Sequence, residues 1–232
     1  MTTVAIVGTS ASRGAAIARR FGAAGHDVAF VSRSLDRLGP VVCALRGEGV
    51  RARVYAADAH DADALVLALD RTAQDLSAIE VLVYDPPSAP GARQHVLETS
   101  PEEIQDAVDR AVVGLVTAVE YVVGGQRVLG RGSVLGITDD DALTGSPFAA
   151  GAAVAAAAVS AYLGMLRDAL APDGIQVARL VTAGADEHGD PSLDPAECAE
   201  LLWHLHTHPA QRTASVAAAT DAPRRVPDGR TS

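Results

Sequence analysis

The chain contains no lysine, and all 19 of its basic residues are arginine. This absence excludes mechanisms that depend on a lysine amine, such as Schiff-base formation. Aromatic residues make up only 3% of the 232 residues, which argues against a stacking surface for nucleic-acid bases. The 29 acidic residues give a net charge of −10, which disfavours nucleic acid or an anionic membrane surface as a partner.

Cysteine is also scarce. Cys43 and Cys198 have no metal-ligand spacing, so we predict no metal site and expect two reduced, buried thiols on helices. The chain begins without a basic stretch before an apolar run, which predicts no secretory signal. The alanine-rich run 148–165 has polar breaks and is a poor membrane span. These features favour a cytoplasmic protein that does not bind a membrane.

Short apolar runs alternate with longer helical patterns along the chain. Six nearly continuous runs are typical of parallel strands covered on both faces: 3–8, 27–32, 51–55, 80–84, 133–138 and 175–181. Helical patterns lie near 13–24, 35–47, 61–77, 101–127 and 146–171, and Asp194-Pro195 marks the start of a later helix. This repetition predicts an α/β protein with a single Rossmann-type, doubly wound parallel sheet of six to seven strands and helices on both faces.

The pattern predicts one domain over residues 1–219. Residues 213–218 are expected to add a last strand, and the polar segment 220–232 is expected to form a frayed tail.

A glycine turn follows the first predicted strand and leads directly into a helix. Gly8 permits the tight turn and Gly14 permits close packing of the helix on the sheet, with Ser10, Ser12 and Arg13 between them. Such a turn directs backbone N–H groups and the positive end of a helix at a pyrophosphate. The turn therefore favours binding of a nucleotide.

The segment Val7-Gly8-Thr9-Ser10-Ala11-Ser12-Arg13-Gly14 resembles the T-G-x-x-x-G-x-G turn of the short-chain dehydrogenase/reductase family. The stretches DVAFVSRS, YAADAHDADAL, IEVLVYDPP and LAPDGIQVARLVTAG agree with the family by position, so the resemblance covers nearly the whole chain. Val7 replaces the threonine, and Ser12 replaces the middle glycine. The resemblance implies an oxidoreductase that uses a nicotinamide cofactor on a small-molecule substrate.

The end of the second strand indicates which cofactor is expected. A carboxylate there would hold the ribose hydroxyls of NAD, but the segment reads Val31-Ser32-Arg33-Ser34. Arg33 can pair with a 2′-phosphate, and the Ser32 hydroxyl can share it. The resemblance places Asp58 at the adenine and Tyr84 beside the cofactor. We therefore expect NADP(H), with NAD(H) or no cofactor as alternatives if Arg33 is merely a solvated arginine.

The family reduces carbonyls with an asparagine, a serine, a tyrosine and a lysine. The resemblance places these four positions, in that order, on Ala111, Asp139 (or Thr138 with a one-residue slip), Ala152 and Ala156. The family's Asn-Asn-Ala-Gly segment after the fourth strand reads Tyr84-Asp85-Pro86-Pro87. The sequence therefore predicts a divergent member that lacks the catalytic tetrad.

Four polar residues at the predicted carboxyl ends of strands are the catalytic candidates: Tyr84, Asp85, Thr138 and Asp139. Tyr84 could donate to a carbonyl. The acids Asp139–Asp141 would repel one another, which raises at least one pKa and suits acid–base chemistry. Alternatively, these acids form a solvated turn. The loop 182–188 could cover the site.

Three functions are consistent with this sequence. The first is an NADP(H)-dependent oxidoreductase whose proton comes from Tyr84, Thr138, one of the acids 139–141 or solvent. The second is a non-redox acid–base enzyme on the same scaffold, such as an isomerase, cyclase or dehydratase. The third is a catalytically inactive protein that senses the cofactor or supports a partner subunit.

The alanine-rich helix 146–171 is expected to pack closely against another copy of the chain. The resemblance implies a homodimer or homotetramer through this helix, whereas the alternative is packing on its own sheet alone. Near the end of the chain, His204, His206 and His208 are expected to be surface or lid residues. Trp203 beside them is expected to be a wall of the core or of a pocket.

Overall fold

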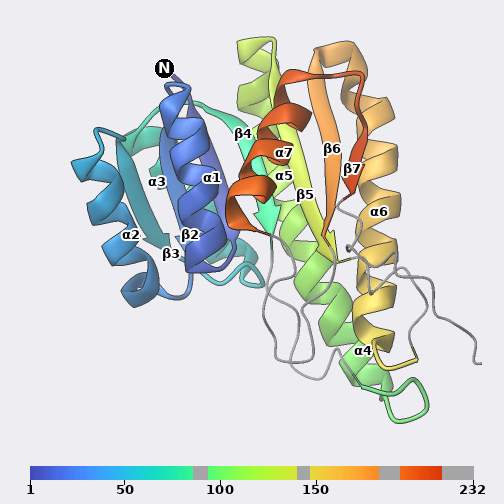
Figure 1. Ribbon diagram of the computed structural model, residues 1–232. Coiled ribbons are helices and arrows are strands. Elements are labelled where there is room, and N and C mark those ends of the chain that lie inside the picture. The colour runs from blue at the N-terminus through green and yellow to red at the C-terminus, as the bar shows by residue number, and fades with distance from the viewer. Residues whose placement is uncertain (86–93, 140–146, 183–193, 216–232) are drawn as a thin grey trace, which may run out of the picture.

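The structure is a computed structural model, and it describes residues 1–85, 94–139, 147–182 and 194–215 (Figure 1). Seven parallel strands form one sheet in the order β3-β2-β1-β4-β5-β6-β7. In chain order the strands are β1 (Thr3–Gly8), β2 (Asp27–Ser32), β3 (Ala52–Ala56), β4 (Ile79–Asp85), β5 (Gly132–Asp139), β6 (Ile175–Thr182) and β7 (Thr213–Ser215). The predicted doubly wound parallel sheet is confirmed.

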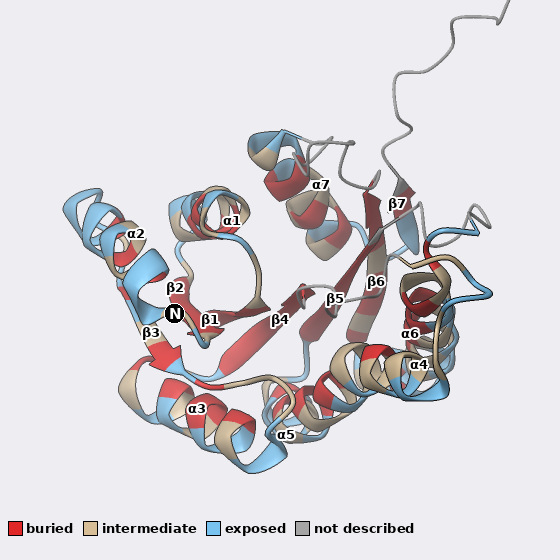
Figure 2. Ribbon diagram, turned by 90° about the horizontal axis from the view of Figure 1, so that it is seen from below, coloured by how far each residue is buried: buried red, intermediate tan, exposed pale blue. Residues whose placement is uncertain are grey.

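Helices cover both faces of the sheet (Figure 2). One face carries α1 (Ala11–Ala23), α2 (Leu35–Gly47) and α7 (Pro195–Thr207). The other carries α3 (Ala62–Asp75), α5 (Gly114–Leu129) and α6 (Ala150–Leu170), with α4 (Pro101–Val108) beside α6. Because both faces are covered, central strands such as β1 and β4 are buried along almost their whole length, which explains their continuous apolar runs.

Polar side chains at the helix starts satisfy backbone N–H groups that lack a partner within the helix. Ser10 caps α1 and Asp61 caps α3. Ser100 and Glu103 form a capping box at α4. Asp194 accepts a hydrogen bond from the amide of Ala196, which confirms the predicted start of α7.

The helix predicted over 101–127 is interrupted. A π-helical segment, η1 (Asp109–Val113), separates α4 from α5. The hydroxyl of Tyr84 on β4 donates to the carbonyl of Arg110 inside this segment at 3.1 Å. A π-turn inserts one residue into the α-helical ladder, and such insertions are frequent near functional sites. The predicted last strand is present as β7 over Thr213–Ser215, and residues 216–218 of that prediction lie outside the described residues.

The prediction that both cysteines are buried is wrong for Cys43. Cys198 is buried on the inner face of α7, but Cys43 is exposed on α2. The reason is its place on the helix, because its neighbour Val42 faces the sheet and the next residue turns about 100° towards solvent.

The helix α6 is the longest in the described residues. Together with the turn η2 (Ala171–Asp173), it is long and apolar enough by composition to cross a membrane, and 28% of the most apolar window is buried. One such helix is weak evidence for a membrane span, because core helices pass the same test. Here the inner face of α6 packs against β5 and β6.

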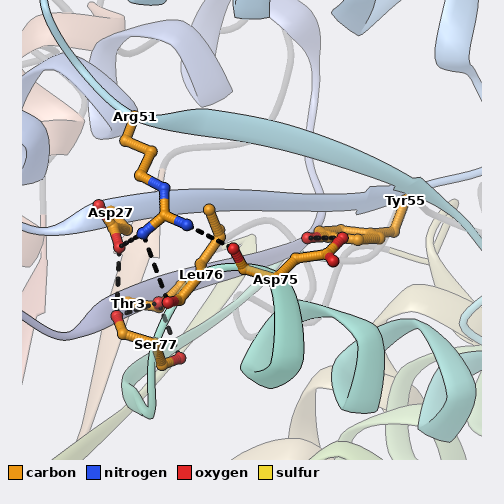
Figure 3. Close-up of polar contacts among 7 residues, drawn as sticks. All are labelled: Thr3, Asp27, Arg51, Tyr55, Asp75, Leu76 and Ser77. Atoms are coloured by element: carbon orange, nitrogen blue, oxygen red, sulfur yellow. Dashed lines mark hydrogen bonds and ion pairs between the residues drawn. The ribbon is translucent and has the colours of Figure 1, made fainter.

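Polar groups at the amino-terminal ends of β1, β2 and β3 bond to one another (Figure 3). Asp27, which is 1% exposed, accepts hydrogen bonds from Arg51 at 3.2 Å and from Ser77 at 3.3 Å. Arg51 also donates to the carbonyls of Asp75 and Leu76. This network ties the loop after α3 to the sheet, at the end opposite to the glycine turn.

Candidate functional site

The candidate site lies at the carboxyl ends of the central strands. From β1 the next strands along the chain are added towards one edge of the sheet, and from β4 they are added towards the other edge. Such a switch point forms the ligand crevice in open α/β sheets. The glycine turn after β1 and Asp85 at the end of β4 meet there, since Gly8 pairs with Asp85 in register.

The glycine turn has the geometry that the sequence predicts. Gly8 has a φ of +85°, which the left-handed region allows glycine at no steric cost. A Cβ at Gly14 would lie 2.8 Å from Thr9 Cγ2 and 3.1 Å from Phe30, so helix α1 can approach β2 only with glycine there. The conformational roles of Gly8 and Gly14 are confirmed, while their binding of a cofactor remains a prediction.

Thr9 has a strained backbone, and its side-chain hydroxyl has no hydrogen-bond partner within the described residues. Its φ of +73° is the one positive φ of a non-glycine residue among the described residues. A β-branched residue in this region is a true outlier and costs of the order of 1–3 kcal/mol. Within the described residues, its buried hydroxyl also has no hydrogen-bond partner. Backbone strain and a hydroxyl without a hydrogen-bond partner at the same residue are typical of a position that contacts a bound ligand.

The remaining polar residues of the turn surround the start of α1. The Ser10 hydroxyl accepts from the amide of Arg13 at 3.3 Å and lies 3.3 Å from the hydroxyl of Ser12. Ser12 itself is exposed, so its Cβ stands at the surface of the turn rather than in a packed interior. Both hydroxyls therefore lie at the positive end of a 13-residue helix.

Arg13 and Asp85 form a largely buried ion pair at the switch point. One guanidinium nitrogen of Arg13 lies 2.8 and 2.9 Å from the two carboxylate oxygens of Asp85. The two side chains are 19% and 9% exposed. Close by, burial raises the pKa of the Cys198 thiol to about 12, so this cysteine is not a nucleophile at neutral pH. The pair links the glycine turn to β4 directly.

Tyr84 is buried and its hydroxyl is already engaged. The side chain is 1% exposed, and its only proton is donated to the Arg110 carbonyl. Burial raises the pKa of Tyr84 well above its ordinary value, and the nearby charge of Asp58 raises it further. A Cβ at Gly114 would overlap both this hydroxyl and the carbonyl of Ala59. In this conformation Tyr84 supports the π-turn rather than presenting a proton to a substrate.

Thr138 lies near the carboxyl end of β5 and is 8% exposed. Its hydroxyl is buried and has no hydrogen-bond partner within the described residues, although its carbonyl accepts from Thr182. A buried hydroxyl without a partner costs about 1–3 kcal/mol unless something completes it. Asp139 ends the strand, but its side chain, like Asp140 and Asp141, lies outside the described residues.

The end of β2 brings together the residues that were predicted to bind the adenosine half of a cofactor. Arg33, 58% exposed, lies 3.5 Å from the carboxylate of Asp58. The Ser32 hydroxyl accepts from the amide of Ser34, and Asp58 also lies 3.5 Å from His60. The carboxyl ends of the neighbouring strands β2 and β3 thus carry a guanidinium, a hydroxyl and a carboxylate. These residues fit NADP(H).

Two of the three alanines at predicted tetrad positions, Ala111 and Ala152, pack in one small cluster. Ala111 lies in η1, and Ala152 and Ala156 lie on α6. Ala111 and Ala152 pack against the same buried pair, Ala107 and Ala155. These two helices therefore meet through methyl groups at these positions.

The histidines of α7 do not all lie at the surface, so that expectation is wrong for His206. Its ring is half-buried, and its Nδ1 lies 2.8 Å from the hydroxyl of Ser133. The ring packs with Phe21, His26 and Trp203, which confirms Trp203 as part of a core wall. Within the described residues, no group of three or more histidine, cysteine or acidic side chains is placed to hold a metal ion.

Sequence reasoning missed the strain at Thr9 and the pairing of Arg13 with Asp85. A signal for the pair was present, because β1 and β4 are neighbours in this topology and residues that follow them face each other. The strain has no comparable signal, since threonine is common in turns that do not require a positive φ.

Comparisons with known proteins agree with this geometry. The profile of the family described as short chain dehydrogenase matches residues 2–190. An uncharacterized oxidoreductase of Mycobacterium tuberculosis is 29% identical over 150 residues. The match covers 62% of this chain but only 43% of that protein, so this chain spans less than half the length of that relative.

Two solved structures share the fold. A variant of actinorhodin polyketide ketoreductase with NADPH has 21% identity, a TM-score of 0.83 and coverage of 94% of this chain and 96% of that one. A Pseudomonas aeruginosa short chain oxidoreductase, described as containing an atypical catalytic center, has 18% identity, a TM-score of 0.82 and coverage of 95% and 97%. Because the family profile spans most of its length, the chain belongs to the short-chain dehydrogenase family.

Proposed function

We propose that this protein is an NADP(H)-dependent oxidoreductase that acts without the usual tyrosine and lysine. The observation that carries the proposal is the glycine turn, in which Thr9 is strained and keeps a buried hydroxyl without a partner in the described residues. A pyrophosphate at the start of α1 would accept hydrogen bonds from this turn and offset the cost of its conformation.

The preference for NADP(H) over NAD(H) rests on Arg33. Its guanidinium is exposed and lies 3.5 Å from the carboxylate of Asp58. At this distance the ion pair is loose enough for a 2′-phosphate to compete with Asp58 for the guanidinium. No acid stands at the end of β2 to hold the ribose hydroxyls of NAD. The actinorhodin ketoreductase variant, which shares the fold, was solved with NADPH.

The proposed chemistry uses a hydroxyl to polarise the substrate. A bound NADPH supplies a hydride to a carbonyl carbon, and the oxygen then needs one proton. We assign to the hydroxyl of Thr138, which has no hydrogen-bond partner within the described residues, the role of donating a hydrogen bond to that oxygen. The proton itself comes from water or from an acid at 139–141, because Tyr84 and Asp85 are engaged with Arg110 and Arg13.

Calorimetry with NADPH and NADH tests the cofactor. We expect NADPH to bind more tightly than NADH. Arg33→Ala should weaken the binding free energy of NADPH by about 1–3 kcal/mol and leave that of NADH unchanged. The matched control is Arg37→Ala, which removes an exposed arginine from the first turn of α2. Equal affinity for both cofactors, or no effect of Arg33→Ala, contradicts the assignment.

Turnover of a panel of activated carbonyl substrates, followed by NADPH absorbance, tests the reaction. We expect Thr138→Val to lower kcat about 100-fold, as loss of one donor to a developing oxyanion does, without changing NADPH affinity. An unchanged kcat in Thr138→Val would remove this residue from the mechanism.

A second candidate, a cofactor-binding protein without turnover, is favoured by the packing of Ala111 and Ala152 on Ala107 and Ala155. It predicts the same calorimetry but no NADPH oxidation with any substrate. The non-redox alternative depends on Asp85 or Asp139. Both oxygens of Asp85 accept from Arg13, so no observation on the described residues favours that alternative.

We also propose a homo-oligomer through α6. Its outer face exposes an apolar stripe at helical spacing, Val154, Ala157, Ala161 and Met165. Burial of such a stripe against its symmetry mate would remove these side chains from water. Light scattering should report a dimer or tetramer, and Val154→Arg should reduce it to a monomer. A monomeric wild-type protein contradicts this proposal.

A further inference from the structure

The end of the sheet opposite the glycine turn contains a cavity of about 410 Å³. It lies at the amino-terminal ends of β4, β5 and β6, which are the ends opposite the arrowheads in Figure 1. Its walls come from the start of β5, the start of β6, the last turn of α6 and the end of α7. Its volume lies in the range of small-molecule sites, about 300–1,000 Å³.

Two arginine guanidinium groups and one glutamate carboxylate line this cavity. Arg131 pairs with Glu80 at 2.9 Å, and Glu80 also accepts from Thr2 at 2.6 Å. Arg167, on the last turn of α6, donates through Nε to the carbonyl of Val177 at 3.3 Å and has no ion pair within the described residues. The cavity wall therefore carries one excess positive charge in a chain whose net charge is −10.

The other polar groups on the wall are neutral and held in place. Burial lowers the pKa of His206, so the imidazole is uncharged at neutral pH, and it bonds to the hydroxyl of Ser133. Gln176 donates to the carbonyls of Leu205 and His208. Ile175, Val177 and Pro209 add apolar surface. A fixed polar frame beside a guanidinium that lacks a carboxylate is the arrangement that binds a small organic anion.

We propose that this cavity binds a small anion that carries one carboxylate or phosphate group and an apolar portion. Arg167 would form the charge-assisted contact, because its two terminal nitrogens are not committed to a carboxylate and their planar fork matches both groups. Arg131 would add charge from the facing wall while Glu80 keeps it in position. The apolar portion of the ligand would lie against Ile175 and Pro209.

The site is independent of the proposed cofactor site, because the two lie at opposite ends of the same strands. Residues Gly132 and Ser133 begin β5 and line the cavity, whereas Thr138 lies near the other end of that strand. A failure of NADPH to bind therefore leaves this proposal intact, and a failure here leaves the proposed function intact.

The test is a titration of the full chain with benzoate and, separately, with phenyl phosphate, followed by the amide NMR signals of Gly132 and Gly174. We expect saturable shifts with a dissociation constant of about 1 mM or below for at least one probe. The probe that binds identifies whether the site prefers a carboxylate or a phosphate. The sole tryptophan, Trp203, whose ring lies 5.3 Å from that of His206, provides a second signal by fluorescence.

Matched arginine variants make the result specific. Arg167→Gln removes no ion pair, so it should fold normally and weaken binding at least tenfold. Arg127→Gln removes an exposed arginine of α5 that pairs with Asp173 outside the cavity wall, and it should leave binding unchanged. NADPH affinity should be the same in both variants. The absence of saturable shifts with both probes, or an equal loss of binding in both variants, overturns the proposal.

Discussion

The two ends of this sheet differ in whether their buried polar side chains have hydrogen-bond partners. At the amino-terminal end, Asp27 accepts from Arg51 and Ser77, and Glu80 accepts from Arg131 and Thr2. At the carboxyl-terminal end, Thr9 and Thr138 keep buried hydroxyls without any partner in the described residues. The amino-terminal end is therefore built for stability, and the carboxyl-terminal end carries a cost that a bound ligand can offset.

This difference between the two ends applies to whole side chains rather than to single atoms. Asp27 and Gln126 at the amino-terminal end each have one oxygen without a partner in the described residues, but the same side chains make other hydrogen bonds. Thr9 and Thr138 make none through their side chains across the described ranges. Backbone strain follows the same division, because the positive φ of Thr9 lies at the carboxyl-terminal end.

The largest effect is expected where the carboxyl-terminal end is packed most tightly. Gly114→Ala would push a Cβ into the Tyr84 hydroxyl and the Ala59 carbonyl, so we expect a loss of about 4 kcal/mol in the free energy of unfolding. The control is Gly124→Ala in the same helix, where nothing lies within 4 Å, and it should stabilise the protein by about 0.5–1 kcal/mol. Urea denaturation measures both. Similar effects of the two substitutions would show that Tyr84 and η1 move freely.

The second prediction concerns the Arg13–Asp85 pair, which is the satisfied part of the carboxyl-terminal end. Asp85→Ala removes the carboxylate that accepts from the largely buried guanidinium of Arg13 and should cost about 3 kcal/mol of unfolding free energy. The double variant Arg13→Ala/Asp85→Ala should recover part of the loss. Glu48→Ala, which breaks the exposed pair with Arg19, should cost less than about 1 kcal/mol. A loss as small as in Glu48→Ala would show that the pair is solvated.

The sequence predicts the fold well because the central strands are covered on both faces. The runs 3–8 and 27–32 coincide with β1 and β2, since continuous burial leaves a continuous apolar run. It predicts the roles of Gly8 and Gly14 because their geometry excludes side chains. It predicts less about Tyr84, whose bond to Arg110 depends on a π-turn that helical periodicity does not show.

The same limit explains the errors on the histidines and cysteines. His206 and His204 are both on α7 with similar neighbours in sequence, but only the tertiary packing decides which of them meets Ser133 and Phe21. Cys43 is exposed because its place on α2 turns it away from the sheet. The predicted acids at 140 and 141 and the loop 183–188 lie outside the described residues, so their roles stay predictions.

The third prediction tests whether the strain at Thr9 serves a ligand. Thr9→Gly relieves the positive φ and should stabilise the free protein by about 1 kcal/mol, the strain energy less the entropy cost of glycine. Thr9→Ala removes the hydroxyl but keeps the strain, so it should change stability less. Both variants should bind NADPH more weakly by calorimetry. A Thr9→Gly protein that is more stable and binds NADPH as well as before would show that the strain has no role in binding.

The smallest effect concerns the amino-terminal end, where His26 and His206 pack 5.7 Å apart against Phe21 and Trp203. Burial lowers the pKa of both imidazoles; Glu80 opposes the shift at both, while Arg131 adds to it at His26. The unfolded chain takes up protons below pH about 6.5, whereas the folded chain resists. The free energy of unfolding should therefore be constant just above that pH and fall as the pH decreases through it towards the lower pKa values of the folded state.

The double variant His26→Gln/His206→Gln should flatten this part of the profile, because the two groups that bind protons differently in the two states are gone. His208→Gln, which replaces an exposed histidine at the end of the same helix, should leave the profile unchanged. Denaturation followed by Trp203 fluorescence between about pH 5 and 8 measures the slope. If the wild-type slope equals that of the double variant, the histidine cluster is hydrated, and burial does not lower the two pKa values.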